Sequence, residues 1–279
     1  MGGEAVLVKI VGMMALHYGI DYLPYAVRSI IDVVDEMWFV HTPVGNHAGG
    51  PSELPLPEAE HPACLYEVAR EAAGKRFRWY SHSGWHTEGD QRDTIFQLAP
   101  DADRILVVDS DEIYGPGLAE AAIRASASRP DVRNWRLPFI HLWKDFYHAI
   151  LHDPAYPTRL INPHALNGDA TFDAEAHDRA KRELLNRTLD HTPEFHTRVV
   201  HCGYAINPEL MRYKMTIHGH RSELRKDIDW FSERYENPDA TTDLHPVGSE
   251  WWNAEPIDPK VYMPLFMLEH PRIAQAVAA

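Results

Sequence analysis

The first 40 residues contain the pattern that most constrains the fold of this chain. Residues 5–11 form a β-branched, mostly apolar run, and residues 37–40 form a second apolar run, as expected for strands buried on both faces. Between them, apolar side chains recur on the face of a helix that packs on a sheet: Leu23, Ala26, Val27, Ile30, Ile31 and Val34. Strand, helix and strand form a βαβ unit, which implies parallel strands joined by a right-handed crossover.

The alternation of strand and helix patterns continues along the first half of the chain. Helices are predicted over residues 64–73, 90–98 and 116–128, and strands over 77–80, 104–108 and 135–141. We therefore predict an α/β fold with a mostly parallel central sheet flanked by helices.

The second half is less regular. Helices are predicted over residues 173–186, 207–218 and 226–235, with a short strand over 197–201. Six prolines interrupt residues 236–279, and Pro removes a backbone donor and breaks regular structure. We predict one domain over residues 1–235 and an extended C-terminal tail packed on it.

The net charge of the chain disfavours two classes of binding partner. The chain has 27 Lys and Arg against 41 Asp and Glu, a formal net charge of −14. This excess of carboxylates disfavours non-specific nucleic-acid binding and docking on an anionic membrane, because both need clustered Lys and Arg. A nucleic-acid acceptor is disfavoured for the same reason, although a local basic groove stays open as an alternative.

Cysteine content and hydropathy indicate a soluble protein of a reducing compartment. Cys64 and Cys202 are too few for a disulfide framework. The first apolar run, residues 6–16, contains Lys9, is too short to span a bilayer and lacks the features of a signal peptide. We predict a cytoplasmic protein without a membrane span, and find no signal for an oligomeric state.

The most informative segment is the apolar strand that ends in Asp109, Asp111 and Glu112. Ligands of open α/β sheets bind outside the carboxyl ends of the strands. If the extended conformation continues past the strand, Asp109 and Asp111 point the same way, because side chains alternate with a period of two. Two such carboxylates suit Mg²⁺ or Mn²⁺. The alternative is a solvated turn that caps the next helix.

Residues 107–112 (VVDSDE) resemble the DxD motif of glycosyltransferases with the GT-A fold, most closely those of the broad family 2 type. Residues 88–93 resemble the Arg-containing helix that precedes this motif, and residues 13–29 resemble the first strand, loop and helix. The resemblance covers roughly residues 5–235 and implies a nucleotide-sugar half over about 1–115 and an acceptor half over about 116–235.

Segments further along the chain resemble the same family. The order His201, Tyr204, Pro208, Glu209 and Lys214 resembles an "H-x-x-Y…P-E…K" block. Arg159-Leu160-Ile161 and His177-Asp178 echo an "R-L-F…H-E" stretch.

The resemblance implies a metal-dependent transferase that uses Mn²⁺ or Mg²⁺ and a nucleotide-sugar donor, with a UDP-sugar favoured. Asp111 would be the main metal ligand, Asp109 would contact the ribose or the metal through water, and His201 would complete the site. The nucleotide-binding residues implied are Ala15, Leu16, His17, His41, Thr42, Arg92, Asp109 and Ser110. Apart from the resemblance, His218 could contact the diphosphate and Lys214 could add charge there, the alternative being a solvated helix end. One departure is His41, since the family often has an acid at the end of its second strand.

Family 2 enzymes invert the anomeric centre, with a carboxylate taking the proton of the acceptor hydroxyl. Asp178 is the first candidate for this base and Glu175 the second, and the acceptor would be a carbohydrate or another hydroxyl. The alternative is that both are solvent-facing charges on the predicted helix over residues 173–186.

Two other functions stay open. A DxD-type carboxylate pair also suits a metal-dependent phosphoesterase, although such pairs typically follow the first strand. A non-catalytic protein that binds a nucleotide or sugar is the third hypothesis, which the intact Asp109 and Asp111 pair disfavours.

Overall fold

The computed structural model describes residues 8–45, 52, 54–151, 157–165, 186–188, 198–217, 224, 228–237, 243–247 and 252–273. The larger of its two sheets has seven strands in the order β10-β6-β9-β4-β1-β2-β3. Their bounds are β1 Ile10–Leu16, β2 Glu36–His41, β3 Phe77–Ser81, β4 Arg104–Val107, β6 Asn134–Arg136, β9 Thr158–Ile161 and β10 Asn186–Thr188. Strand β9 runs antiparallel to β4 and β6, and the other four pairings are parallel, which confirms the predicted mostly parallel sheet.

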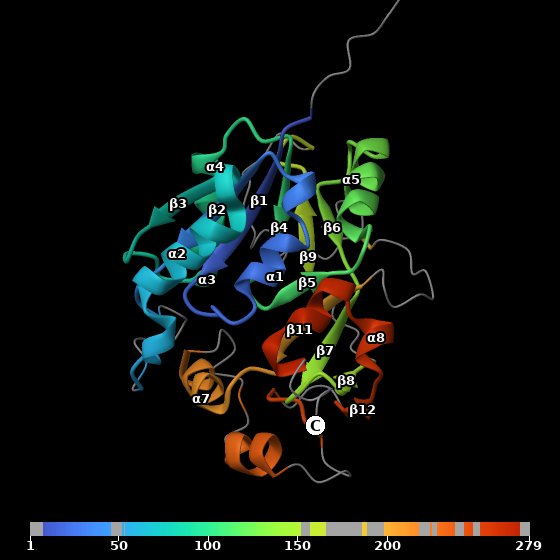
Figure 1. Cartoon of the computed structure of the whole chain (residues 1–279). Coiled ribbons are helices and arrows are strands. Elements are labelled where there is room, and N and C mark those ends of the chain that lie inside the picture. The colour runs from blue at the N-terminus through green and yellow to red at the C-terminus, as the bar shows by residue number, and fades with distance from the viewer. Residues whose placement is uncertain are drawn as a thin grey trace, which may run out of the picture.

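Both faces of this sheet are buried by helices (Figure 1). On one face Met14, Phe39 and Leu106 pack in a cluster with α1 (Leu23–Arg28), α2 (Pro62–Ala73) and α5 (Leu118–Ser128). On the other, Met13 and Val107 pack with the segment that holds α3 (Glu88–Asp93) and α4 (Ile95–Leu98). Neighbouring residues of a strand thus face opposite clusters, as the period of two requires.

A second sheet of five strands lies beyond the carboxyl end of β4 (Figure 1). Its order is β12-β8-β7-β11-β5. The bounds are β5 Glu112–Tyr114, β7 Phe139–Trp143, β8 His148–Ile150, β11 Val199–Tyr204 and β12 Glu255–Pro256. The chain passes from the larger sheet to this one within residues 108–111, so the acidic motif lies at the junction of the two sheets.

The predicted strand over residues 135–141 is wrong in one respect. It is two strands, β6 and β7, which belong to different sheets. The break falls at Leu137 and Pro138, and Pro has no N–H to donate to a ladder. The carbonyl of Pro138 instead accepts from the N–H of Val199 at 2.9 Å, at the start of β11.

Two predicted helices are also divided. The helix pattern of residues 23–34 becomes α1 and a 3₁₀ turn, η1 (Ile31–Val33), after Ser29 Oγ donates back to the carbonyl of Ala26. The pattern of residues 90–98 becomes α3 and α4, separated at Thr94. By contrast, α7 (Pro208–Ile217) begins as predicted, with Asn207 Oδ1 accepting from the N–H of Glu209 at 2.8 Å.

The described part of the tail packs on the same apolar core. Its elements are η6 (Phe231–Glu236), α8 (Pro259–Tyr262) and η7 (Leu265–Glu269), of which η6 begins later than the predicted helix. Buried tail residues in the main cluster include Trp252, Met263 and Met267. Within the described ranges, no helix combines the length and the apolar character needed to cross a membrane.

Candidate functional site

The carboxyl ends of β1 and β4 define the candidate site. From β1 the chain continues to β2 and β3 on one side, and then returns to β4 on the other side of β1. This reversal of strand order is a topological switch point, where parallel sheets leave a crevice for ligands. The loops that follow the two strands touch, since Ser110 Oγ donates to the carbonyl of Tyr18 at 2.9 Å.

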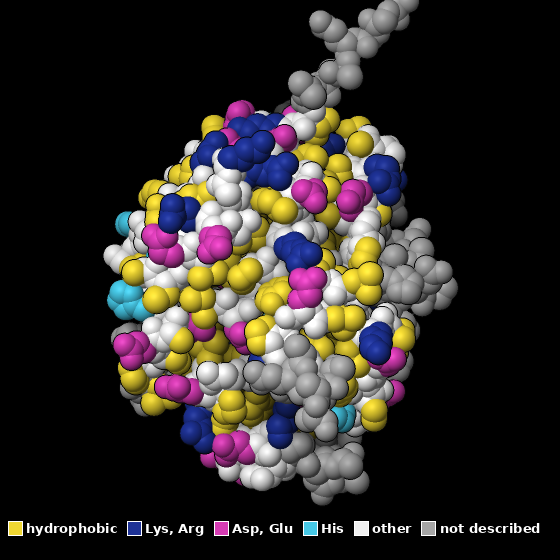
Figure 2. Space-filling view, viewed as in Figure 1, with side chains coloured by type: hydrophobic (Ala, Val, Ile, Leu, Met, Phe, Trp, Pro, Cys, Tyr) yellow, Lys and Arg dark blue, Asp and Glu magenta, His cyan; other side chains and the backbone are white. Residues whose placement is uncertain are grey.

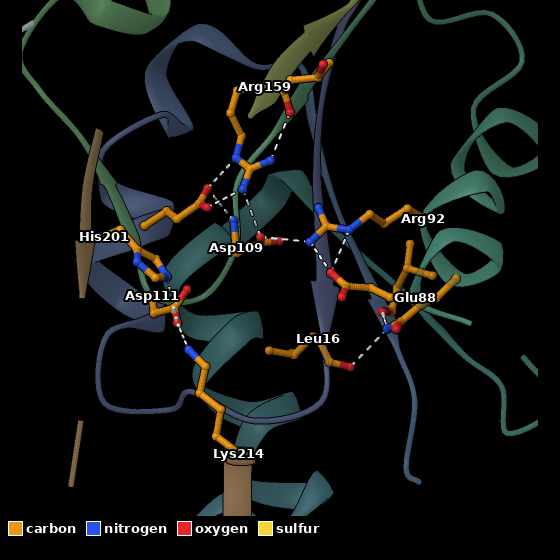
Figure 3. A network of polar contacts seen from close by, with 12 residues as sticks. Leu16, Glu88, Arg92, Asp109, Asp111, Arg159, His201 and Lys214 are labelled. Atoms are coloured by element: carbon orange, nitrogen blue, oxygen red, sulfur yellow. Dashed lines mark hydrogen bonds and ion pairs between the residues drawn. The ribbon is translucent and has the colours of Figure 1, made fainter. Parts of the chain in front are cut away.

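The acidic motif forms a turn instead of a continued strand. The N–H of Glu112 donates to the carbonyl of Asp109 at 3.0 Å, which closes the turn. The expectation that Asp109 and Asp111 point in one direction required an extended backbone, and the turn removes that condition. In the structure Asp109 contacts two arginines and Asp111 contacts Lys214 and His201 (Figure 3).

Asp109 lies between two guanidinium groups. Arg92 Nη2 donates to its Oδ2 at 2.8 Å, and Arg159 Nη2 donates to the same oxygen at 3.2 Å. The other oxygen, Oδ1, is buried and has no hydrogen-bond partner in the described part of the chain. Asp109 therefore retains an acceptor atom for a ligand hydroxyl, a water or a cation.

A chain of alternating charges extends from Asp109 in both directions. Arg92 also contacts Glu88, one helical turn earlier on α3, and Arg159 contacts Glu112. Burial alone would lower the pKa of Arg92, but the attraction of Asp109 and Glu88 outweighs it and raises that pKa well above its ordinary value. Burial raises the pKa of Glu112 to about 7, against the opposing attraction of Arg159.

The first turn of α3 sets the position of Arg92 next to Asp109. A capping box fixes the helix there: Thr87 Oγ1 accepts from the N–H of Asp90, and Asp90 Oδ2 accepts from the N–H of Thr87, each at 3.0 Å. Gln91, buried beside Arg92, donates to the carbonyl of Val40 at 2.6 Å and to that of Leu16 at 3.3 Å. These two bonds anchor the helix to the carboxyl ends of β1 and β2.

Asp111 faces the second sheet and α7. Lys214 Nζ lies 3.4 Å from its Oδ2, and His201 Nε2 lies 3.6 Å from the same oxygen. Strand β11 lies between β5 and β7, which places His201 opposite Glu112 on one side and His141 on the other. The Nδ1 atoms of His141 and His201 are 2.6 Å apart, so one of them donates to the other.

The residues predicted to hold the nucleotide lie along the ends of β1 and β2. His17 Nδ1 lies 2.8 Å from the carbonyl of Thr42, and His17 Nε2 lies 2.6 Å from Tyr213 Oη on α7. Leu16 is fully buried, so its side chain belongs to the core. Ala15, one residue earlier on β1, is partly buried.

His41 ends β2 in an apolar setting. Its ring stacks on Trp79 at 4.9 Å, its Nδ1 lies 2.9 Å from Ser81 Oγ, and its buried Nε2 has no hydrogen-bond partner among the described residues. Burial, followed by the proximity of His17, lowers the pKa of His41 to about 4. His41 is therefore neutral at physiological pH.

The motif residues offer few protein ligands for a divalent cation. Within the described ranges no group of three or more His, Cys, Asp and Glu side chains is arranged to hold a metal ion. Asp111 and His201 nevertheless offer two donor atoms 3.6 Å apart, and Asp109 offers its unpartnered oxygen. Mg²⁺ and similar cations are commonly held by one or two carboxylates together with water and substrate phosphates.

Three predicted site residues lie outside the described residues: Asp178, Glu175 and His218. Conversely, several residues of the site were not predicted from the sequence. Glu60, in η2 (Glu58–Glu60), is one of these residues. Its Oε2 accepts from the N–H groups of Gly19 and Ile20 at 2.7 and 3.0 Å. The other missed residues of the site are Gln91, His141 and Tyr213. Glu112 was recognised in the acidic motif, but its pairing with Arg159 was not.

No protein-family model matches the chain, and no curated protein sequence matches it. Among solved structures it resembles a mannosyl-3-phosphoglycerate synthase from Rubrobacter xylanophilus, with 15% identity, 49% of this chain and 41% of that chain covered, and a TM-score of 0.35. It also resembles a CMP:2-keto-3-deoxy-manno-octonic acid synthetase in complex with CTP, with 11% identity, 66% and 90% of the two chains covered, and a TM-score of 0.39.

A third similar structure is a 4-diphosphocytidyl-2C-methyl-D-erythritol synthase from Anaerococcus prevotii DSM 20548, with 9% identity, 74% and 96% of the two chains covered, and a TM-score of 0.39. The matched region spans less than half of the first of these proteins, at 41%. Since all three TM-scores lie below 0.5, no activity is transferred from them to this chain.

Proposed function

We propose that this protein is a glycosyltransferase that moves a sugar from a nucleotide-diphosphate donor, with a UDP-sugar favoured, to an acceptor hydroxyl. The observation that carries this proposal is the turn from Asp109 to Asp111 at the switch point of the sheet, with Arg92 on one carboxylate and Lys214 and His201 on the other. Residues 1–235 would form the catalytic domain, in a protein that we place in the cytoplasm.

The charges at this turn suit a diphosphate leaving group. In a displacement at the anomeric carbon, the bond from that carbon to the phosphate oxygen breaks and negative charge develops on the diphosphate. Arg92 and Lys214 can neutralise this charge from two sides, and guanidinium groups bind phosphate oxygens in a bidentate manner. Figure 3 shows both side chains directed at the acidic turn from opposite elements, α3 and α7.

Asp111 and His201 would hold a divalent cation, Mn²⁺ or Mg²⁺, and Asp109 would contact it through water or bind the ribose. A cation bound there would supply Lewis-acid neutralisation of the departing diphosphate. His201 is suited to metal binding, because a metal-binding histidine usually donates its second ring N–H to a neighbouring acceptor. Here that acceptor would be His141 Nδ1.

The nucleoside would lie along the carboxyl ends of β1 and β2, against Ala15, His17, His41 and Thr42. His41 offers a neutral ring nitrogen, Nε2, that has no hydrogen-bond partner within the described ranges, and this would suit a hydrogen bond to a base edge. Ser110 supports this side by tying the acidic turn to the loop after β1, and His218 stays a predicted diphosphate contact.

The acceptor hydroxyl would lose its proton as its oxygen attacks the anomeric carbon, giving inversion. Asp178 remains the first proposed base and Glu175 the second, because the transfer needs a carboxylate within hydrogen-bond reach of that hydroxyl. Both are tested by substitution with the matching amide, which keeps the size of the side chain and removes the base.

The test of the proposed function is a binding and turnover screen. UDP-, GDP-, dTDP- and CMP-sugars are each combined with Mn²⁺, Mg²⁺ or EDTA, and both the melting temperature and the released nucleoside diphosphate are measured. Asp111→Asn should abolish the metal-dependent stabilisation and the turnover, whereas Asp32→Asn, at a carboxylate with 95% exposure, should change neither.

The outcomes separate the alternative functions. Release of nucleoside diphosphate supports the transferase, and release of inorganic phosphate from phosphomonoesters supports the phosphoesterase instead. Stabilisation by a nucleotide and Mn²⁺ without any turnover supports a binding protein. A wild-type chain that responds to no nucleotide, with or without metal, overturns the proposal.

The surface charge of the protein also bears on the class of acceptor. On the face shown in Figure 2, a group of Lys and Arg side chains lies at the top of the view with acidic side chains among them. Over the full sequence, 41 Asp and Glu outnumber 27 Lys and Arg. We therefore propose a carbohydrate or another small hydroxyl compound as the acceptor rather than a nucleic acid, whose phosphates require clustered cations.

A further inference from the structure

The proposed function uses Lys214 at the donor diphosphate, whereas the structure holds it against Asp111. It extends from α7 to Asp111, with Nζ 3.4 Å from Asp111 Oδ2 and 3.1 Å from the carbonyl oxygen of Gly203. Both side chains are largely buried, with exposures of 12% for Lys214 and 13% for Asp111. The ammonium group is thus the close counter-charge of the carboxylate to which we assign the metal.

The oxygen that Lys214 contacts is the one that His201 also faces. His201 Nε2 lies 3.6 Å from Asp111 Oδ2, so imidazole and ammonium converge on one carboxylate oxygen. A divalent cation bound to that oxygen and to His201 would lie within a few ångströms of the ammonium group and repel it. The lysine in this position and a bound metal ion therefore exclude one another.

Lys214 is held by fewer directed contacts than the two arginines of this site. Arg92 and Arg159 each contact two carboxylates, and a guanidinium held by several directed hydrogen bonds is fixed in place. Lysine instead carries a point charge on a flexible stem of four carbons. Besides Asp111, the described residues give Lys214 a contact with the carbonyl of Gly203 and with the face of Tyr204 at 5.3 Å.

Gly203 provides the space in which this exchange can occur. A Cβ atom at this position would lie 2.4 Å from His201 Nε2 and 2.6 Å from Lys214 Nζ. Any side chain here would press on both groups, so the glycine keeps the region between them open.

We propose that Lys214 is an exchangeable counter-ion: it neutralises Asp111 while no metal is bound, and moves to the diphosphate of the donor when a divalent cation takes its place. This rests on the proposed function, and it deepens that function by making metal binding and diphosphate binding depend on one side chain. It also predicts that removal of the lysine changes the two affinities in opposite directions.

The test is Lys214→Met, with binding of Mn²⁺ followed by electron paramagnetic resonance of the free ion. Without nucleotide, the variant should bind Mn²⁺ at least about tenfold more tightly, because a like charge next to the cation has been removed. At saturating Mn²⁺, the same variant should bind UDP about tenfold more weakly, because the diphosphate has lost a cation. Lys75→Met, at an exposed lysine of η3 (Gly74–Arg76), should change neither affinity.

A second variant distinguishes the loss of the charge from damage to the fold. Lys214→Gln also removes the charge but retains a donor for the carbonyl of Gly203, and it should show the same pair of opposite changes. If both variants lose Mn²⁺ affinity, or bind Mn²⁺ as the wild type does, the exchange is overturned.

The failure of this inference is distinguishable from that of the proposed function. If the wild type binds Mn²⁺ and loses it on Asp111→Asn, the metal site stands, and an unchanged Mn²⁺ affinity of Lys214→Met overturns the exchange alone. If the wild type binds no Mn²⁺ with or without UDP, both the metal step and the exchange are overturned.

Discussion

Arg159 lies alongside Glu112 so that two nitrogens of the guanidinium face the two carboxylate oxygens. Nε donates to Oε2 at 2.7 Å, and Nη2 contacts Oε1. Arg159 belongs to β9 of the larger sheet and Glu112 to β5 of the smaller one, so this buried pair joins the two sheets immediately behind the acidic turn. Since Arg159 also reaches Asp109, the pair sets the position of one side of the candidate site.

Removal of one member of this pair should cost more than removal of both. Arg159→Met leaves Glu112 buried without its partner, which should reduce the free energy of unfolding by about 3–5 kcal/mol. The double variant Arg159→Met/Glu112→Leu replaces both charges with apolar groups and should recover most of that loss. Urea unfolding of the two variants and the wild type makes the comparison, and a double variant no more stable than Arg159→Met contradicts it.

His41 should make the fold sensitive to acid. Burial lowers its pKa from 6.5 to about 4 in the folded chain, so between these values the unfolded chain binds a proton that the folded chain does not. Stability is therefore fully present above pH 6.5 and is lost as the pH falls toward 4. The loss from this residue between pH 7.5 and pH 5 should be about 2 kcal/mol.

The measurement is urea unfolding at pH 7.5 and pH 5 for the wild type and for His41→Gln. The variant cannot titrate at this position, so its stability should fall less between the two pH values. His164→Gln, at an exposed histidine, is the matched control and should behave as the wild type does. An equal pH dependence in His41→Gln and the wild type removes His41 as the cause.

Local sequence patterns were sufficient to predict the parallel core. The helix face of α1 and the apolar strands β2 and β4 each lie within a short window, and their pattern is visible without knowledge of the fold. The first strand was predicted over residues 5–11, whereas β1 spans Ile10–Leu16, because the apolar run continues to Leu16 and its pattern does not show which part pairs with β2 and β4. The acidic motif could be placed at the carboxyl edge of the sheet because it directly follows β4.

The second sheet could not be predicted in this way. Its strands β5, β8 and β12 have three, three and two residues, which is too short to show a period. Several pairings of this sheet also join segments distant in sequence, as β11 with β7 and with β5. Sequence analysis left open whether the chain turns or extends at Asp109, because the contacts that hold Asp109 come from Arg92 and Arg159 on other elements.

The same reason explains why Glu60 and Gln91 escaped sequence analysis. Glu60 binds the backbone of Gly19 from 41 residues away, and Gln91 binds the carbonyl of Leu16 from 75 residues away. Glu60 belongs to no motif, and the resemblance of residues 88–93 rests on Arg92 and not on Gln91. An acid in a loop or a polar residue on a short helix is ordinarily solvated.

Glu60 should act on donor binding through the loop after β1. Its Oε2 accepts from the N–H groups of Gly19 and Ile20, and burial raises the pKa of Glu60. Glu60→Ala leaves these donors without their acceptor and should weaken UDP binding, measured by calorimetry with Mn²⁺, by about tenfold. Glu60→Gln retains a carbonyl oxygen and should bind UDP nearly as the wild type does. If Glu60→Gln is as weak as Glu60→Ala, the charge is what the loop requires.

Gly19 should be intolerant of any side chain, for two separable reasons. Its φ of +107° is strained for an L-residue, and a Cβ atom would lie 2.1 Å from Ser110 Oγ and 2.8 Å from Ser110 Cβ. The backbone strain alone should cost about 1–3 kcal/mol. Gly19→Ala should therefore destabilise the chain and push Ser110 out of position.

Because Ser110 lies between Asp109 and Asp111, this displacement should also weaken Mn²⁺ and UDP binding. The double variant Gly19→Ala/Ser110→Gly removes the clash and keeps the backbone strain, so it should recover part of the lost stability in urea unfolding. Ser110→Gly alone controls for loss of the hydrogen bond to the carbonyl of Tyr18. If the double variant is no more stable than Gly19→Ala, the contact between the two loops is not what restricts this position.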